Sequence, residues 1–463
     1  MKFIYNNSQL LWTFILTIMI ISCDDKLDLE PAQSLDPSVA TGNAENIRSI
    51  LVGMYDEAAH GSAEGPNLEE NIYGGNITLT SELLANSGNL QWNGTFLQPR
   101  EFNLKQITTT NTTVRNIWLN GYEVNNQANI VLANLDKFDD TDERNRIEGE
   151  AKFLRALTYF DLVRFYGIQY DAGQTNAQLG VPIILDAILG PGDVTEPSRN
   201  SVEEVYTQVI NDLTAAIDLL PESNDIFADK YTAQALLARV YLQQGDYQNA
   251  LNAANDVIQN SGHALATNYG GAFNNNEDSS EDIFAWQITS QDGENDMNTF
   301  WAGSDFGGRS GNPDTAINDP FLDIYDDAND DRRAFFYDTS RGRATTKWQS
   351  EFANIPYIRL AEMYLIRAEC NQRLTSSLGA AVLDDINALR NRANATSLLG
   401  VSLDIILAER ERELSFEGHA IHDARRLKQN IGSLPYDDNT LVLPIPQRET
   451  DANPNLEQNP GYN

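Results

Sequence analysis

Residues 232–260 constrain the fold more than any other part of the chain, because their pattern fits two antiparallel helices that lie close together. Apolar residues recur at helical spacing in both halves of this segment. Ala238 and Ala250 are small enough to let the two helix backbones approach closely. Gly245 permits the turn between them, and Tyr247 is expected to wedge between the helices. Since one such pair cannot bury its apolar face alone, neighbouring pairs must stack on it.

This segment resembles one tetratricopeptide unit, a repeat of about 34 residues. The segments near 118–166 and 357–395 are candidates for degenerate copies. Ser201 and Glu204 form a capping box that opens a further helix. We therefore predict a mostly α fold, with tetratricopeptide-type helix pairs as scaffold, long irregular loop insertions and minor β structure. Helical periodicity runs through 44–59, 114–138, 142–166, 201–220, 232–260, 357–372, 379–393 and 403–428.

Two long segments, about 60–112 and 261–354, lack helical periodicity and are rich in polar residues and glycine. Long irregular segments in compact proteins are usually functional or disordered. We expect both to be insertions that face a ligand. Within the second, Trp286 lies beside Phe284 in a strand-like run and is expected in the core.

The N-terminus has the pattern of a secretory signal peptide over residues 1–22. An apolar run from Leu10 to Ile21 is too short to span a bilayer, which requires about 20 residues. Ser22-Cys23 directly after this run resembles a lipobox, so Cys23 is the predicted lipid anchor. A secretory signal without lipidation is the alternative. Residues 23–43 read as a lipidated tether, and residues 44–463 as one domain.

The formal charge of −35 excludes nucleic acid as a natural partner, because the chain would repel a phosphate backbone. It also argues against a strongly anionic ligand. Two cysteines and four histidines do not suggest a disulfide framework or a metal site, and no cofactor is predicted. The run 326–331 lacks the glycine and glutamate of an EF-hand, so we interpret it as a solvated loop. Charged residues in 409–417 have the spacing of helical ion pairs.

Several motifs follow one another in order over nearly the whole mature chain, at Leu27–Pro31, Gly149–Gly167, Ile355–Glu369, Ile406–His419, Leu443–Glu449 and Asn459–Tyr462. In sequence, order and spacing they resemble the SusD/RagB lipoproteins of Bacteroidota. One departure follows Gly418-His419, where the family has Arg-Trp-Phe-Asp-Leu and this chain has residues 420–424 as Ala-Ile-His-Asp-Ala. The local packing there must differ.

The resemblance implies a lipid-anchored outer-membrane protein on the cell surface. Such a protein sits as a lid on a SusC-like TonB-dependent transporter and passes an oligosaccharide or polysaccharide to it. The resemblance also implies four tetratricopeptide-like helix pairs, a ligand site on the insertions, and no enzymatic activity.

Sugar recognition requires flat aromatic rings beside hydrogen-bonding groups. The resemblance implies that Trp92 and Trp301 stack on the ligand, with Asn93 beside the first. The weaker candidates are Tyr73, Phe300, Asp305 and Arg309. The alternative for every ring is that it anchors its own loop to the body.

Three functions compete. The first is capture of a neutral glycan, such as a β-glucan of laminarin type, since the acidic body would repel anionic polysaccharides. The second is a surface glycoside hydrolase using two carboxylates. The third is a transporter lid or adaptor that binds peptides.

Overall fold

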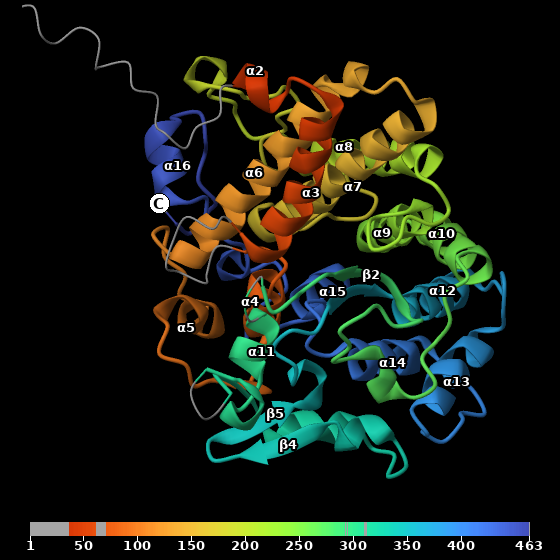
Figure 1. Ribbon diagram of the computed structural model, residues 1–463. Helices are drawn as coiled ribbons and strands as arrows, with labels where there is room; N and C mark the ends of the chain where they lie inside the picture. The colour runs from red at the N-terminus through yellow and green to blue at the C-terminus, as the bar shows by residue number, and fades with distance from the viewer. Residues whose placement is uncertain (1–36, 62–70, 292, 294, 310–312, 463) are drawn as a thin grey trace, which may run out of the picture.

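A succession of packed helices forms the scaffold of the computed structural model, which describes residues 37–61, 71–291, 293, 295–309 and 313–462 (Figure 1). Helix α6 packs on α7, α7 on α8, α9 on α10, α10 on α12, and α12 on α13. Each neighbour covers apolar surface of the one before it. The scaffold helices are α3 (Ala44–His60), α6 (Thr112–Ala133), α7 (Thr141–Tyr166), α8 (Val202–Leu219), α9 (Lys230–Gln244), α10 (Tyr247–Asn260), α12 (Leu360–Leu374), α13 (Val382–Arg392), α14 (Leu403–Leu414) and α15 (Ala420–Arg426).

The helix pair predicted at 232–260 is confirmed as α9 and α10. Ala238 and Ala250 are fully buried. Gly245 ends α9 in the left-handed conformation, with φ 75°. Tyr247 is half-buried, and the guanidinium of Arg373 in α12 lies 4.7 Å from its ring centroid. The predicted capping box is also present, with Ser201 Oγ accepting the Glu204 N–H at 3.2 Å.

Two predicted helices are wrong in part. Residues 357–359 belong to strand β6 (Ile355–Arg359), and α12 begins after it. The single helix expected over 403–428 is interrupted between α14 and α15, where Phe416 and Gly418 have φ of 63° and 86°. This turn directs the Phe416 ring against Trp301 and Phe321, with centroids 5.2 and 4.8 Å away.

The first insertion is more ordered than we predicted, because it contains α4 (Asn76–Ala85) and α5 (Leu97–Leu104). Every residue of α4 from Asn76 to Leu84 is buried. Helix α4 contacts α5, α6 and α15. A helix covered on all sides has no polar face, so its sequence shows no amphipathic period.

Two small antiparallel sheets complete the fold. Strands β1 (Leu90–Trp92), β3 (Thr315–Ile317), β5 (Gly342–Thr345) and β4 (Phe336–Thr339) pair in that order, so the sheet joins the first insertion to the second. Strand β2 (Asp282–Trp286) pairs with β6, and Trp286 is a core residue as predicted. The fold class is therefore mostly α with minor β structure, as predicted. The short helices are α2 (Pro37–Ala40), α11 (Asp296–Trp301) and α16 (Gln447–Ala452).

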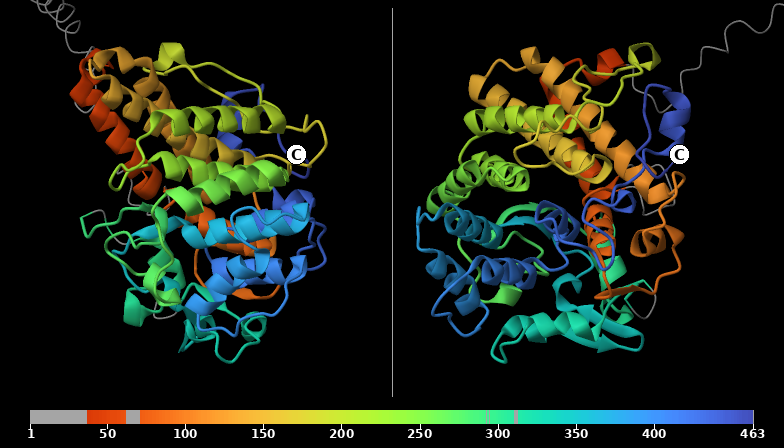
Figure 2. Two further views of the ribbon diagram at one scale, coloured as in Figure 1. Left: turned by 90° about the vertical axis from the view of Figure 1, so that its right-hand side faces the viewer. Right: turned by 180° about the vertical axis from the view of Figure 1, so that it is seen from behind.

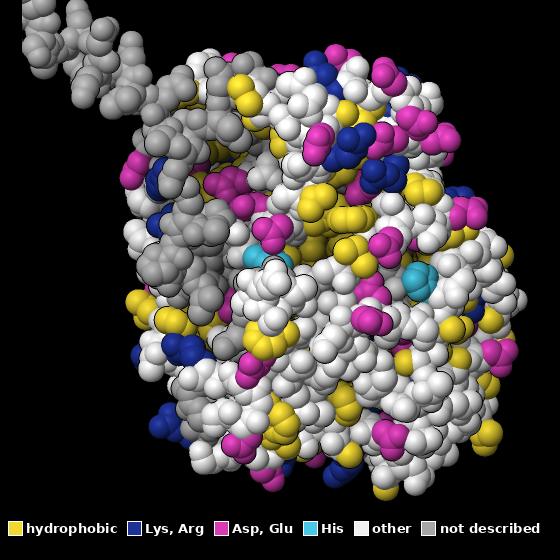
Figure 3. Space-filling view, viewed as in Figure 1, with side chains coloured by type: hydrophobic (Ala, Val, Ile, Leu, Met, Phe, Trp, Pro, Cys, Tyr) yellow, Lys and Arg dark blue, Asp and Glu magenta, His cyan; other side chains and the backbone are white. Residues whose placement is uncertain are grey.

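The β4–β5 hairpin forms one end of the molecule in all three views, and the layer of α3, α6, α7 and α8 forms the other (Figures 1 and 2). On the face shown in Figure 3, acidic side chains are scattered between polar ones and do not gather in one patch. Among the described residues, no helix combines the length and hydropathy that crossing a membrane requires.

A buried ion network fastens the second insertion to the scaffold. Arg332, from the insertion, donates to Glu409 at 2.7 Å and to Glu413 at 3.2 Å, both on α14. Lys347 donates to Glu417 at 2.5 Å. We define the buried ion network by the residues Glu281, Asp330, Arg332, Lys347, Arg359, Arg390, Arg392, Glu409, Glu413 and Glu417.

The network corrects two details of the sequence interpretation. Only Arg412 and Glu409 form an ion pair within α14, at 3.5 Å, whereas most partners of the α14 carboxylates come from distant segments. Asp330, expected in a solvated loop, is buried and accepts from Arg332 at 2.8 Å. Helical spacing therefore predicted ionic structure in this region, but not the partners.

Candidate functional site

The two insertions meet at the β1–β3 edge, and the structure brings most of the predicted site residues together there. The backbone N–H of Asn93 donates to the carbonyl of Asp314 at 2.6 Å, next to the pairing of Trp92 with Thr315. The Trp92 ring also lies 6.0 Å from that of Phe300. Residues separated by about 200 positions in the sequence thus lie together in one region of the fold.

Trp92 is largely covered by its own loop and is 9% exposed. Its Nε1 donates to the carbonyl of Phe96 at 3.1 Å. Gly94 lies against the indole so closely that an added Cβ would be 2.3 Å from Cζ2. The ring therefore anchors its own loop, which was the alternative to ligand binding, and leaves little of its surface open to a ligand.

Trp301 is a core residue with 0% exposure, so the expectation of an open indole face is wrong for it. All residues of α11 are buried, including Phe300. The Trp301 ring packs on Phe416, which arrives from the distant C-terminal region. Tyr73 is buried as well, stacked on Trp286 with centroids 4.6 Å apart. These rings stabilise the body and do not reach a ligand on the surface.

The accessible groups lie just outside this buried layer. Phe306 is 39% exposed, and its ring centroid lies 5.0 Å from that of half-buried Tyr337. Asp305 and Arg309 are exposed, and Asn93 is half-buried. We call this surface the outer ledge and define it by Asn93, Asp305, Phe306, Arg309 and Tyr337.

Three polar groups of the outer ledge have fixed positions. The Arg309 guanidinium pairs with Asp314 at 2.9 Å and stacks 3.9 Å from the ring centroid of Phe96. The Asn93 amide donates to the carbonyl of Arg341 at 3.1 Å. The Tyr337 hydroxyl accepts the N–H of Gly303 at 2.8 Å, and burial raises the pKa of that hydroxyl.

The outer ledge combines apolar ring surface with amide, carboxylate and guanidinium groups. This combination suits a ligand with a C–H face and a rim of hydroxyls. Phe306 and Tyr337 were missed as candidates by sequence reasoning. The two glycines that follow Phe306 were a usable signal, because they indicate a tight turn. At Gly308 an added Cβ would lie 1.9 Å from the Ala302 carbonyl oxygen, so only glycine fits this turn, which leaves Phe306 outside. Within the described residues, no cluster of His, Cys, Asp and Glu is suited to hold a metal ion.

Known proteins match the chain over nearly its full length. A family model described as "Starch-binding associating with outer membrane" matches residues 25–242, and the SusD family model matches residues 192–462. SusD-like protein P2 of Formosa agariphila is 26% identical over 97% of this chain and 99% of that protein.

Solved structures agree with this match. A putative sugar binding protein from Bacteroides vulgatus has a TM-score of 0.79 at 27% identity, covering 91% of this chain and 99% of that one. A laminarin binding SusD-like protein has a TM-score of 0.73 at 23% identity, covering 91% of this chain and 100% of that one, and shows the fold alone. Family models, relatives and fold agree along the whole described chain, which therefore belongs to the SusD family.

Proposed function

We propose that this chain captures a neutral glycan on the outer ledge and delivers it to a SusC-like TonB-dependent transporter. The observation that carries the proposal is the outer ledge itself. The exposed Phe306 ring packs on Tyr337, whereas Asn93 and Arg309 both bind Asp314. Membership of the SusD family supports the same function, as does the match of residues 25–242 to a model described as "Starch-binding associating with outer membrane". Cys23, the proposed lipid anchor, and the proposed signal peptide lie outside the described residues.

The charge of the chain favours a neutral ligand. With a net charge of −35, the protein would repel uronate and sulfate groups at short range. Arg309, the guanidinium of the outer ledge, is already paired with Asp314 and is not free to bind an anion. We propose a β-glucan of laminarin type, in keeping with the laminarin binding neighbour of the same fold.

The outer ledge does not favour a hydrolase. Glycoside hydrolysis requires two carboxyl groups roughly 5–9.5 Å apart across the scissile bond. Asp305 is the carboxylate that defines the ledge, the neighbouring Asp314 is buried and ion-paired with Arg309, and the Glu351 carboxyl packs against Gly307. We therefore propose binding without cleavage.

Affinity electrophoresis in a gel containing laminarin tests the proposal. We expect the protein to be retarded, and Phe306→Ala and Tyr337→Ala to lose most of the retardation because each removes ring surface from the ledge. Tyr436→Ala is the matched control, since that ring lies beside Lys428 on another surface segment. Unchanged mobility of the native chain in laminarin, or stronger retardation in carrageenan or alginate, contradicts the proposal. Chromatography of the laminarin afterwards should show no shortened products.

A further inference from the structure

A second site candidate is a cavity of about 450 Å³ between α4, α14, α15 and the 3₁₀ helix Asp319–Ile324. This volume falls within the range of small-molecule sites, about 300–1,000 Å³. No residue of the outer ledge lines the cavity. The two sites are thus built from different parts of the chain.

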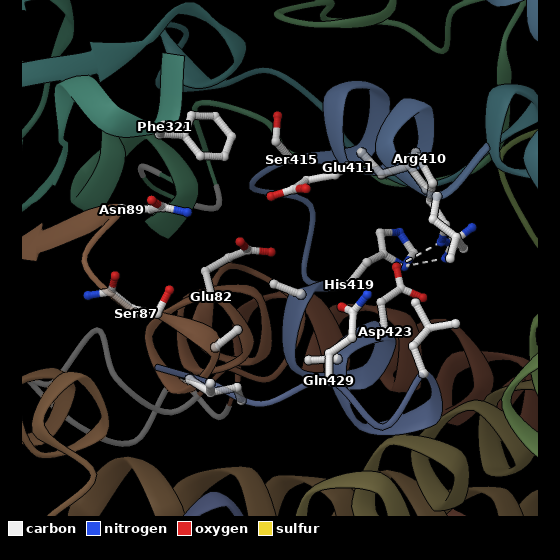
Figure 4. Close-up of a pocket in the computed structure, with 18 of the residues that line it drawn as sticks. Glu82, Ser87, Asn89, Phe321, Arg410, Glu411, Ser415, His419, Asp423 and Gln429 are labelled. Carbon is white, nitrogen blue, oxygen red and sulfur yellow. Dashed lines mark hydrogen bonds and ion pairs between the residues drawn. The ribbon is translucent and has the colours of Figure 1, made fainter. Parts of the chain in front are cut away.

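Two carboxyl groups, Glu82 and Glu411, point into the cavity from opposite walls (Figure 4). Glu82 is only 6% exposed and accepts the backbone N–H of Gly418 at 3.0 Å. Within the described chain, no Lys, Arg or His forms an ion pair with either group. A buried carboxyl without a cation is costly unless it is neutral or binds a ligand.

The two carboxyl groups offer complementary hydrogen-bonding functions. Burial raises the pKa of Glu82 to about 8, so at neutral pH this group carries its proton and can donate. Glu411 is more accessible, and loss of solvent around its carboxyl group raises its pKa as well. Glu411 can accept hydrogen bonds from hydroxyl groups when ionised.

The remaining walls supply amide, hydroxyl and aromatic groups. Asn89, Ser87 and Gln429 line the cavity, and the Phe321 ring lies at one end (Figure 4).

No uncompensated positive charge is available in these walls. Arg410 donates to Asp423 at 2.7 Å and lies 3.5 Å from Glu362. Burial lowers the pKa of His419 well below its usual value, so its ring is neutral. An anionic ligand is therefore disfavoured.

From this arrangement we infer that the cavity binds one neutral sugar ring, separately from the outer ledge. Its hydroxyls would donate to Glu411 and accept from Glu82 and the amide of Gln429. The Phe321 ring, only 5% exposed, closes one end of the cavity. The inference rests on the proposed function, since the ring is taken to be an end unit of the same glycan. We therefore expect a short oligosaccharide or the end of a chain to enter the cavity.

Isothermal titration calorimetry of the mature chain with glucose and with laminaribiose tests this inference. We expect binding of at least one of these sugars. Glu411→Ala and Gln429→Ala should each weaken it about tenfold or more, because each removes a hydrogen-bonding partner inside the cavity. Glu148→Gln is the control for removing one surface carboxylate, and unchanged melting temperatures show that the variants fold.

The laminarin gel separates this inference from the proposed function. The cavity variants should stay retarded in the gel, and Phe306→Ala should keep its affinity for the small sugar. The inference is overturned if neither sugar binds, if both cavity variants bind as well as the native chain, or if Phe306→Ala alone abolishes binding. Clear preference for glucosamine over glucose overturns the assignment of a neutral ligand. If the native chain is not retarded in the laminarin gel, the proposed function is refuted instead.

Discussion

Replacing Glu413 by glutamine should destabilise the protein strongly, because this carboxylate lies at the centre of the buried ion network. It is fully buried and accepts from Arg332 at 3.2 Å and from Arg359 at 3.1 Å, with Arg392 as a third partner. Burial alone would raise the pKa of Glu413, but Arg392, Arg359, Arg332 and Lys347 together hold it well below its usual range. The group is therefore a carboxylate at neutral pH.

The magnitude follows from what remains after the substitution. Removing one partner of a buried ion pair costs about 3–5 kcal/mol. Here Arg332 keeps Asp330 and Glu409, while Arg359 and Arg392 keep Glu281. Since no guanidinium is left entirely alone, we expect the lower end, about 3 kcal/mol. At about 2.1 cal/mol/K per residue, this corresponds to a melting temperature lower by ~3 °C for a chain of this length.

Thermal and urea unfolding followed by circular dichroism measure this loss. Glu148→Gln is the control, because it makes the same chemical change in a half-buried pair at the surface, with Lys152 at 3.4 Å on α7. Such surface pairs contribute about 0.5 kcal/mol or less. If Glu413→Gln and Glu148→Gln shift the melting temperature equally, the network does not stabilise the fold in the way we describe.

Three further changes test other parts of the structure. Trp301→Phe should leave laminarin retardation unchanged, because this ring is fully buried, and loss of retardation with native stability would contradict that role. Glu82→Gln should reduce the fall of the melting temperature with rising pH between about pH 5 and 8. The native carboxyl has its pKa raised from 4.5 to about 8 by burial, so the folded state binds the extra proton and its stability falls as pH rises. Ser201→Ala should cost about 1 kcal/mol in urea unfolding through loss of the helix cap, whereas Ser201→Asp should retain most of it.

Helices such as α8 and α10 could be predicted because they bury one face and expose the other. The pair α9–α10 was identified from apolar residues at helical spacing together with Ala238, Gly245, Tyr247 and Ala250. Helix α4 was missed because burial on all sides removes the polar half of the pattern. The break between α14 and α15 was missed too, although Gly418 marks it, because the cause is the long-range packing of Phe416 on Trp301.

The proposed outer ledge lies in the predicted segments and includes the predicted candidates Asn93, Asp305 and Arg309, but its rings are not the predicted ones. The sequence pointed to both insertions, and β1–β3 pairing does bring them together. Which rings remain outside depends on contacts that no local pattern shows. Trp92 is covered by Gly94 and Phe300. In this protein the large Trp92 and Trp301 rings anchor their loops to the body, whereas the smaller Phe306 ring stays exposed.

Helix α14 links the rigid frame to the cavity. Successive residues of a helix are rotated by about 100°, so residues four apart share a face and residues two apart lie on nearly opposite faces. Glu409 and Glu413 accordingly enter the buried ion network, whereas Glu411 points into the cavity. The network holds one face of α14 against the second insertion, and this fixes the direction of Glu411 on the other face. Loss of Glu413 should therefore weaken laminaribiose binding indirectly, by less than loss of Glu411 itself, while the outer ledge keeps its affinity for laminarin.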